Sequence, residues 1–377
     1  MTALLEKLNI AIVGACSRGA SFQAGLAACP EARVHAVCDL DAEGLPAAAA
    51  AFTAAEQYTD FQQMLSRSDL DAVVIATPMP LHAAQSTMAL QQGLHVLCEV
   101  TAAVSVDEAQ QLVAAAHAST GIYMLAENCN YFITNVIVTQ LVRQGLFGTT
   151  YFADGEYLHN VKELTERTPW RRRWQLGIDG ITYGTHSLGP ILQWLPNDRV
   201  ASVCCAGSGQ HYQDPRGEDY HQDTSVMLGK LVSGGLVKLR VDLVSERPPV
   251  TTTYQLQGTQ GCYESARTPG GSHRVWLSDR CDDREAWMDL SELEEEFLPH
   301  RWRHSREQAQ SAGHGGSDYF VVQEFIEAAA SGGPSPIGVH EAMDMTLPGL
   351  ISQQSIAAQG QWLPVPDSRD WVAGARS

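Results

Sequence analysis

The chain has 377 residues, a hydrophobic share of 44% and a formal net charge of −18 at pH 7. This length exceeds what a single hydrophobic core usually supports, so we expect two domains. The negative charge disfavours nucleic acid and anionic membranes as partners, because both attract basic surfaces. No apolar run approaches the length of a bilayer span, and the N-terminus lacks the basic region and long apolar core of a signal peptide.

The cysteines and histidines give further bounds on the environment of the protein. Nine cysteines, an odd number without a CxxC pair, favour a reducing cytoplasm over a disulfide framework. The thirteen histidines show neither an HExxH motif nor paired Cys/His spacing, so we expect no metal site.

The first residues of the chain have the layout of a dinucleotide-binding site. An apolar strand over 9–13 runs into a glycine turn over 14–19, and a helix is expected over 20–28. The start of a helix behind such a turn binds pyrophosphate, because its backbone N–H groups point at the anion. The turn residues expected to contact the cofactor are Gly14, Cys16, Ser17 and Arg18, with Cys16 in the place of the middle glycine.

A second apolar strand, expected over 34–38, ends at Asp39. A carboxylate at this place accepts hydrogen bonds from the adenosine ribose hydroxyls and repels a 2′-phosphate. Leu40 rather than a basic residue follows it, which also favours NAD over NADP. The alternative is an ordinary βαβ crossover without a ligand.

Strands and helices continue to alternate to about residue 125. Strands are expected over 72–76, 95–98 and 123–126, and helices over 42–55, 61–66, 82–92 and 107–119. This alternation predicts a doubly wound parallel sheet of the Rossmann type, whose ligands bind at the carboxyl ends of the strands. Further candidates for cofactor contacts at these ends are Thr77, Pro78, His82, Glu99 and Asn128.

The pattern changes at about residue 149, where apolar residues begin to alternate with period two. Strands are expected over 150–158, 200–206, 225–231, 235–243 and 251–257, which predicts an α+β domain with an open, mostly antiparallel sheet. Residues 264–312 show no clean period and are expected to form a long surface excursion, followed by helices over 319–330 and 340–358. We therefore expect a cofactor domain over 1–127 and a substrate-binding and oligomerisation domain over 128–377, with the C-terminal helix and tail packing back.

Three motifs carry a resemblance to a known family. They are Thr77-Pro78 with His82, Gly93-x-His95-Val96 with Glu99, and Gly184 with His186. The chain resembles the glucose-fructose oxidoreductase, inositol dehydrogenase and rhizopine-catabolism family, whose members oxidise or reduce sugars and cyclitols. Val100 stands where most members carry the lysine that transfers a proton, so a standard sugar dehydrogenase of this type is disfavoured.

A narrower branch of that family fits further motifs. These are Glu127-Asn128-Cys129-Asn130-Tyr131, Glu156-Tyr157-Leu158-His159, 183–190, His314-Gly315-Gly316-Ser317-Asp318, and Pro366-Asp367 with Trp371. They resemble the NAD-dependent glycosidases typified by α-N-acetylgalactosaminidase, which also lack the lysine. Thr101 departs from this branch, which has proline there.

The resemblance implies a redox cycle without net redox. NAD takes a hydride from C3 of the sugar, the ketone acidifies the C2 proton, a base removes that proton and the anomeric group leaves. Water then adds and the hydride returns. Carried over by motif, Tyr183 is expected to be the C2 base and His186 to lie beside the C3 hydroxyl, although the two roles could be exchanged. Thr185 or Ser187 is expected to cap a helix that runs through Trp194.

Other residues are candidates for contacts with the substrate. Glu127, Tyr157, His159 and His314 would bind sugar hydroxyls, while Asp318 is a candidate N-cap of the helix that follows it. Aromatic faces that stack on sugars and arginines that bind anions lie together at Trp170, Arg171, Arg172, Arg173 and Trp174. An anionic sugar is one interpretation of these arginines, and subunit contacts or pairing with nearby acids is the other.

We thus expect a cytoplasmic NAD-dependent glycosidase that acts on a sugar or glycoside. The alternatives are an NAD-dependent dehydrogenase or epimerase of sugars, glycosides or cyclitols, and a non-enzymatic NAD sensor. The resemblance further implies a homodimer or homotetramer.

Overall fold

The computed structural model describes residues 7–214, 221–281 and 283–373. The chain divides into two compact units, each built from separate stretches of sequence. The first unit comprises residues 1–131, 304–343 and 368–377, and the second comprises residues 132–303 and 344–367. The sequence places a boundary at residue 127, whereas the first unit runs to Tyr131 and also takes in two stretches from the C-terminal part of the chain.

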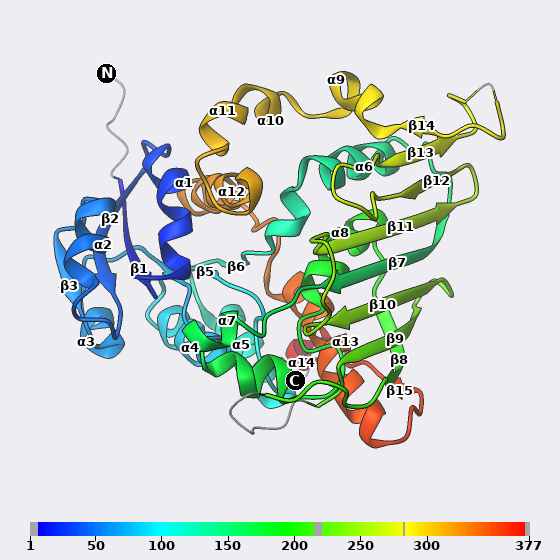
Figure 1. Cartoon of the computed structure of the whole chain (residues 1–377). Coiled ribbons are helices and arrows are strands. Elements are labelled where there is room, and N and C mark those ends of the chain that lie inside the picture. Colours follow the sequence, from blue (N-terminus) through cyan, green and yellow to red (C-terminus); the bar gives the residue numbers. More distant parts are fainter. Residues whose placement is uncertain (1–6, 215–220, 282, 374–377) are drawn as a thin grey trace. The chain divides into compact units, whose positions relative to one another are not determined.

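The first unit contains a six-stranded sheet in the order β3-β2-β1-β4-β5-β6, all of whose pairings are parallel (Figure 1). Its strands are β1 Leu8–Val13, β2 Ala32–Cys38, β3 Glu56–Tyr58, β4 Ala72–Ile75, β5 His95–Cys98 and β6 Tyr123–Leu125. The strands β4, β5 and β6 are buried almost throughout, as expected of parallel strands covered on both faces. The predicted Rossmann architecture is confirmed.

Helices of the first unit connect these strands and extend into its C-terminal stretches. They are η1 Arg18–Phe22, α1 Gln23–Ala27, α2 Leu45–Phe52, α3 Phe61–Leu65, η2 Met79–Leu81, α4 His82–Gln91, α5 Val106–Ala118, η3 Asn128–Tyr131, α11 Arg306–Ala309, η6 His314–Gly316, α12 Ser317–Ser331 and α14 Asp370–Ala373. The long helix α12 packs on α1 and on η3, and α14 packs on α5. The amide of Gln323 fixes the first of these contacts by donating to the Gly25 carbonyl at 3.1 Å.

The second unit contains a nine-stranded sheet in the order β14-β13-β12-β11-β7-β10-β9-β8-β15 (Figure 1). The central pair of β7 and β10 is parallel, and the other pairs are antiparallel. The strands are β7 Thr150–Leu158, β8 Val200–Gly207, β9 Thr224–Leu231, β10 Leu236–Asp242, β11 Thr252–Gly258, β12 Gly261–Glu264, β13 Arg274–Leu277, β14 Met288–Asp289 and β15 Leu363–Pro364. The predicted mixed, mostly antiparallel sheet is confirmed.

The second unit also contains helices. They are α6 Ile133–Arg143, α7 Leu164–Arg167, the π-helical η4 Arg172–Leu176, α8 Thr185–Trp194, η5 Leu290–Leu293 and α9 Glu294–Phe297, while α10 His300–His304 and α13 Val339–Ala357 cross the division between the units. Helix α8 packs on β7 and β11 and also contacts α6. None of the described helices is long and apolar enough to cross a bilayer.

The prediction of a surface excursion over 264–312 is wrong. This stretch contains β13, β14 and several short helices, and it buries Val275, Leu277, Phe297 and Trp302. The strands have only four and two residues, which is too short for a periodic pattern to emerge from the sequence.

Candidate functional site

The glycine turn joins β1 to η1 in the first unit. Gly14 has a φ of +81°, and a Cβ atom there would lie 2.5 Å from the Ala76 carbonyl oxygen, so only glycine fits. The Cys16 N–H donates to Oδ2 of Asp39 at 2.8 Å, and the Asp41 N–H donates to Oδ1 at 3.0 Å. The predicted residues at the tips of β1 and β2 are therefore tied together, with Ser17 exposed at the surface of the turn.

Arg18 follows the turn, and acidic side chains of the first unit surround its guanidinium. It forms a bidentate pair with Asp318, with distances of 2.7 and 2.9 Å, and an ion pair with Oε1 of Glu99 at 2.6 Å. Its guanidinium carbon also lies 4.6 Å from the centre of the Phe22 ring. The predicted cofactor residue Arg18 thus connects the glycine turn to the end of β5 and to α12.

Asp318 is a partner of Arg18 that the sequence did not predict. The prediction that it caps a helix is wrong, because α12 begins at Ser317 with Gly316 as its N-cap residue. Asp318 is fully buried, and burial raises the pKa of its carboxyl. The hydrogen bonds from His314 and Arg18 lower it by more, so the pKa falls to about 2.

His314 borders the same carboxylate from the exposed side. Its Nδ1 lies 3.0 Å from Oδ2 of Asp318, and 45% of its side chain is exposed. A buried carboxylate that holds Nδ1 fixes the orientation of the ring and directs Nε2 away from the pair. Glycines at 315 and 316 adopt positive φ next to it, which shapes the backbone into the start of α12.

The remaining predicted cofactor residues lie after β4, β5 and β6. The Thr77 hydroxyl donates to the Gln85 amide oxygen at 2.6 Å, next to Pro78, and His82 opens α4 with only 1% of its surface exposed. Glu99 and Asn128 are buried at the ends of β5 and β6. Glu127, predicted to contact substrate, is fully buried and accepts the Cys129 N–H at 3.1 Å.

An aromatic cluster in the second unit brings together four of the predicted residues. The rings of Tyr183 and His186 have centres 5.0 Å apart and meet edge to face. The Tyr157 ring lies 5.5 Å from that of Tyr183 and 5.0 Å from that of His186. Its hydroxyl lies 2.9 Å from Nδ1 of His159. We call these four residues the Tyr–His cluster.

Strand β7 and helix α8 hold the Tyr–His cluster in place. Tyr157 lies near the end of β7, and His186 is the second residue of α8. The predicted cap by Thr185 or Ser187 is wrong, because both residues lie inside α8 and Gly184 is the N-cap residue. The Tyr254 hydroxyl donates to the His186 carbonyl at 2.6 Å, a contact without a signal in the sequence.

The cluster contains two phenols and two imidazoles, which are side chains that exchange protons with sugar hydroxyls. Tyr157, Tyr183 and His186 each keep 8% of their surface exposed. These groups are thus nearly removed from bulk water, yet each retains a small accessible surface.

The three arginines of the Trp–Arg segment at 170–174 lie in different environments. Arg172 is buried and forms ion pairs with Glu166 and Asp214, which agrees with the alternative of pairing with nearby acids. Arg171 lies 4.4 Å from the Trp170 ring centre and Arg173 lies 5.1 Å from that of Trp174. The Arg173 side chain is exposed.

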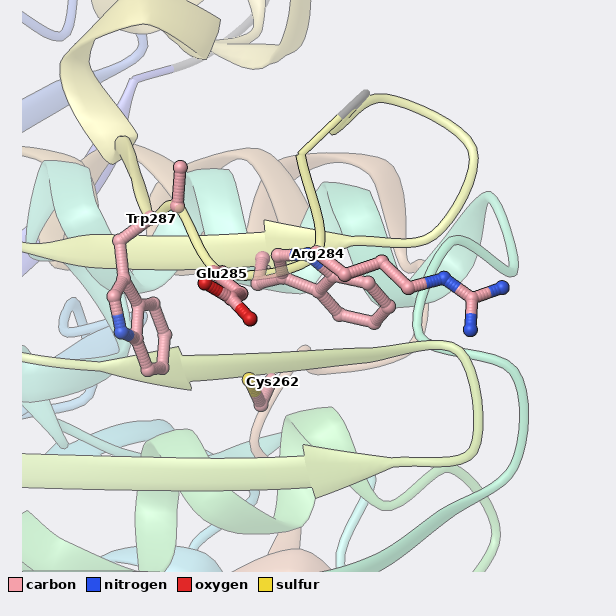
Figure 2. A pocket seen from close by; sticks show the side chains of 6 residues that line it. Cys262, Arg284, Glu285 and Trp287 are labelled. Carbon is pink, nitrogen blue, oxygen red and sulfur yellow. The ribbon is translucent and has the colours of Figure 1, made fainter.

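A separate cavity of about 370 Å³ lies beside β12 and β13 in the second unit. Figure 2 shows Cys262, Glu285 and Trp287 around it, with Arg284 extending away from them. None of the predicted site residues lines this cavity, so it is distinct from the Tyr–His cluster.

Two family models match successive parts of the chain. The family model "Oxidoreductase family, NAD-binding Rossmann fold" matches residues 8–127, and the model "Glycosyl hydrolase 109, C-terminal domain" matches residues 131–372. The chain is 30% identical to a "Glycosyl hydrolase family 109 protein" of Saccharopolyspora erythraea, over 96% of this chain and 83% of the relative. A protein of the same description from Solibacter usitatus is 27% identical, over 93% and 85% of the two chains.

Solved structures show the same fold at lower identity. A levoglucosan dehydrogenase in complex with NADH and levoglucosan superposes with a TM-score of 0.77 at 17% identity, over 96% of this chain and 100% of that one. An NAD-binding oxidoreductase from Klebsiella pneumoniae gives a TM-score of 0.78 at 18% identity, over 96% and 99% of the two chains. At these identities the likeness establishes the fold alone.

Proposed function

Because the chain belongs to glycosyl hydrolase family 109, we propose that it cleaves a sugar glycoside by transient oxidation at C3, with NAD as a resident redox catalyst. Residues 8–127 are an NAD-binding Rossmann domain. The observation that carries the proposal is the Tyr–His cluster, which places a phenol and an imidazole side by side within the part of the chain that matches the glycosidase model.

The first unit fits NAD. The tight turn at Gly14 brings backbone N–H groups to the carboxyl edge of the parallel sheet, where pyrophosphate binds in such folds. The carboxylate of Asp39 at the tip of β2 suits the ribose hydroxyls, and Leu40 beside it is 88% exposed, an apolar surface that an adenine ring would cover. Gly14, Cys16, Ser17, Asp39 and Thr77-Pro78 would hold the cofactor, which when bound accepts a hydride from C3 and later returns it.

His186 receives the proton of the C3 hydroxyl in our assignment. A hydride leaves a carbinol carbon only as its hydroxyl loses a proton, so a base must lie next to that oxygen. His186 lies in the first turn of α8, with its ring against that of Tyr183 and 8% of its surface exposed, so its imidazole is placed to accept that proton.

Tyr183 removes the proton from C2. A ketone at C3 stabilises the negative charge that forms at C2 as an enolate, and the bond from C1 to the leaving group then breaks. Water adds to C1 of the unsaturated ketone while C2 regains a proton, so the electrons and protons balance over the cycle. The reverse assignment of Tyr183 and His186 preserves this chemistry.

Tyr157 and His159 would support this pair. The Tyr157 ring contacts both Tyr183 and His186, and its hydroxyl interacts with His159. This arrangement restricts the rotamers of the acid/base residues and supplies a hydroxyl for a sugar oxygen. Glu127 and His314 are further proposed sugar contacts.

The test is a panel of aryl glycosides, neutral and acidic, incubated with the protein and NAD in deuterated water. We expect aglycone release with deuterium at C2 of the product sugar and no accumulation of NADH. Stoichiometric NADH with an intact glycoside would instead establish a dehydrogenase, and C2 or C3 inversion without cleavage would establish an epimerase.

We also propose a cytoplasmic homodimer or homotetramer. The cysteine pattern supports a reducing compartment, and exposed Tyr151, Trp287 and Trp362 in the second unit support subunit contacts there. An anionic sugar remains part of the proposal through Arg171 and Arg173 alone, because acids already neutralise Arg172.

A further inference from the structure

His82 makes a contact that the family resemblance does not explain. It is the first residue of α4 in the first unit and keeps only 1% of its surface exposed. Its Nε2 lies 2.7 Å from the carbonyl oxygen of Thr77, in the turn after β4, and its Nδ1 lies 2.8 Å from the carbonyl oxygen of Thr101, in the loop after β5.

These two distances determine the protonation state of the ring. A carbonyl oxygen can only accept a hydrogen bond, so each ring nitrogen must donate. A neutral imidazole carries a single N–H and would turn a lone pair of its other nitrogen toward a carbonyl lone pair at hydrogen-bond distance. We propose that His82 is a buried imidazolium that ties the turn after β4 to the loop after β5 and so positions both for NAD.

The surroundings of His82 agree with a charged ring. Burial lowers the pKa of His82, but the Cys98 sulfur on β5 and the two carbonyl oxygens raise it by more, to about 9. Two further titratable groups near Cys98 are the buried Tyr123 hydroxyl on β6, which interacts with Cys98, and Glu99, which directly follows β5 and pairs with Arg18.

His95, the first residue of β5, has a pKa that is shifted in the opposite direction. Its Nδ1 accepts the Ile122 N–H at 3.2 Å, and burial lowers the pKa of this imidazole. His82 of α4 and His95 of β5 thus differ in charge because the first faces two acceptors and the second faces a donor.

His82 acts through the backbone that it holds and is therefore a positioning residue. Thr77 and Pro78 are proposed NAD contacts, while Glu99 directly precedes the loop that contains Thr101. Loss of the ring charge removes one of the two donors, which frees one loop from the other. The inference rests on the NAD-binding domain and is independent of the glycosidase chemistry.

The first test measures the ring itself in the wild-type protein, which avoids any folding defect. We expect long-range proton–nitrogen NMR spectra of the ¹⁵N-labelled full chain at pH 7 to show protons on both nitrogens of His82. Loss of one of these protons is expected near pH 9. A single protonated nitrogen at pH 7 would overturn the proposal.

The second test measures NAD binding against pH by titration calorimetry. In the wild type we expect the dissociation constant to rise as the pH passes about 9. His82→Gln keeps an N–H donor but cannot titrate. We expect its dissociation constant to be about tenfold higher at pH 7, the cost of one charge-assisted hydrogen bond, and to be unchanged between pH 7 and 10.

His95→Gln is the matched control, and we expect it to bind NAD with the wild-type pH profile. A pH dependence that persists in His82→Gln, or that disappears in His95→Gln, would contradict the assignment to His82. Because NAD affinity is the readout, a failure of the glycosidase proposal would leave this result unaffected.

Discussion

Tyr183 and His186 are only three positions apart in the sequence but differ in local structure. Tyr183 lies in the turn before α8 and His186 lies in its first turn, yet their ring centres are only 5.0 Å apart. Gly184 between them has helical dihedral angles (φ −82°, ψ −10°), so the two side chains lie on the same side of the chain, as residues three positions apart do in a helix. Roles that depend on a single hydroxyl or ring nitrogen can therefore be tested with substitutions that keep the ring in place.

Replacement of Tyr183 by phenylalanine removes the proposed C2 base and preserves the ring contacts. We expect the rate of aglycone release to fall by at least about a hundredfold, the usual contribution of a general base, while NAD affinity stays unchanged. Tyr151→Phe, which changes a tyrosine that is 47% exposed in the same unit, is the control and should retain full activity. Undiminished aglycone release by Tyr183→Phe would remove this residue from the mechanism.

Asp318 offers a test of charge at the residue scale. Its pKa falls from 3.8 to about 2 on folding, so the ionised carboxylate stabilises the fold above pH 4, and this contribution disappears as the pH falls toward 2. We expect Asp318→Asn to lower the free energy of unfolding at pH 7 by about 2 kcal/mol, the value of a hydrogen bond to a charged group. The measurement is urea unfolding at several pH values.

The difference between wild type and Asp318→Asn should shrink below pH 4, and a difference that stays constant down to pH 2 would refute the ion pair as its source. Glu296→Gln is the control, because it breaks another bidentate pair, the one between Glu296 and Arg280. The Glu296 side chain is 53% exposed. We expect little change from this control, because water screens exposed pairs.

At the scale of elements, the contact between β7 and α8 determines the geometry of the Tyr–His cluster. A Cβ atom on Gly155 in β7 would lie 2.9 Å from both the Ser187 Cβ and the Ile191 Cδ1 in α8. A larger side chain at 155 must therefore displace the helix that carries His186.

Gly155→Val should thus separate packing from cofactor binding. We expect a loss of stability of about 1 to 3 kcal/mol from overpacking and a clear fall in kcat, with the affinity for NAD unchanged. Thermal unfolding, steady-state kinetics and NAD titration would measure the three quantities. Wild-type kcat in this variant would show that α8 tolerates displacement and that the close contact does not position His186.

The sequence predicted long or strongly patterned elements well and short ones poorly. The strand expected over 150–158 has the bounds observed for β7, a nine-residue strand at the centre of its sheet. In contrast, β12, β13 and β14 were missed, because these strands of two to four residues lack the uninterrupted run of buried apolar residues that marks the equally short β4 and β5. Tertiary pairing decides such elements.

The same limit applies to the candidate site. Motifs identified Arg18 and Arg172 as functional cations, but no local pattern shows that Asp318 and Glu99 hold the first or that Glu166 and Asp214 hold the second. Side-chain partners far apart in the chain carry no periodic signature. The residue types at strand ends were therefore predictable from the sequence, whereas their hydrogen-bond and ion-pair partners were not.

At the scale of the whole molecule, both units are discontinuous in sequence. The stretch 368–377 belongs to the NAD-binding unit, where α14 packs on α5 and the Ser368 hydroxyl lies 2.7 Å from Nδ1 of His340. The end of the chain therefore contributes to the unit that its beginning forms.

Removal of residues 368–377 should destabilise the NAD-binding unit. We expect the unfolding temperature of the protein to fall by about 2 to 4 °C for each kcal/mol of lost packing. Ser368→Ala removes only the hydroxyl contact and should cause a smaller change. An unaltered unfolding temperature in the truncated protein would show that these contacts contribute nothing.

The pairing of Arg18 with Asp318 also has a consequence for folding during synthesis of the chain. The two residues are 300 positions apart. At about 5 to 20 residues per second, Arg18 is synthesised roughly 15 to 60 s before its carboxylate partner. During that interval the nascent Rossmann sheet lacks α12, and the surface of α1 that α12 will cover is open to chaperones.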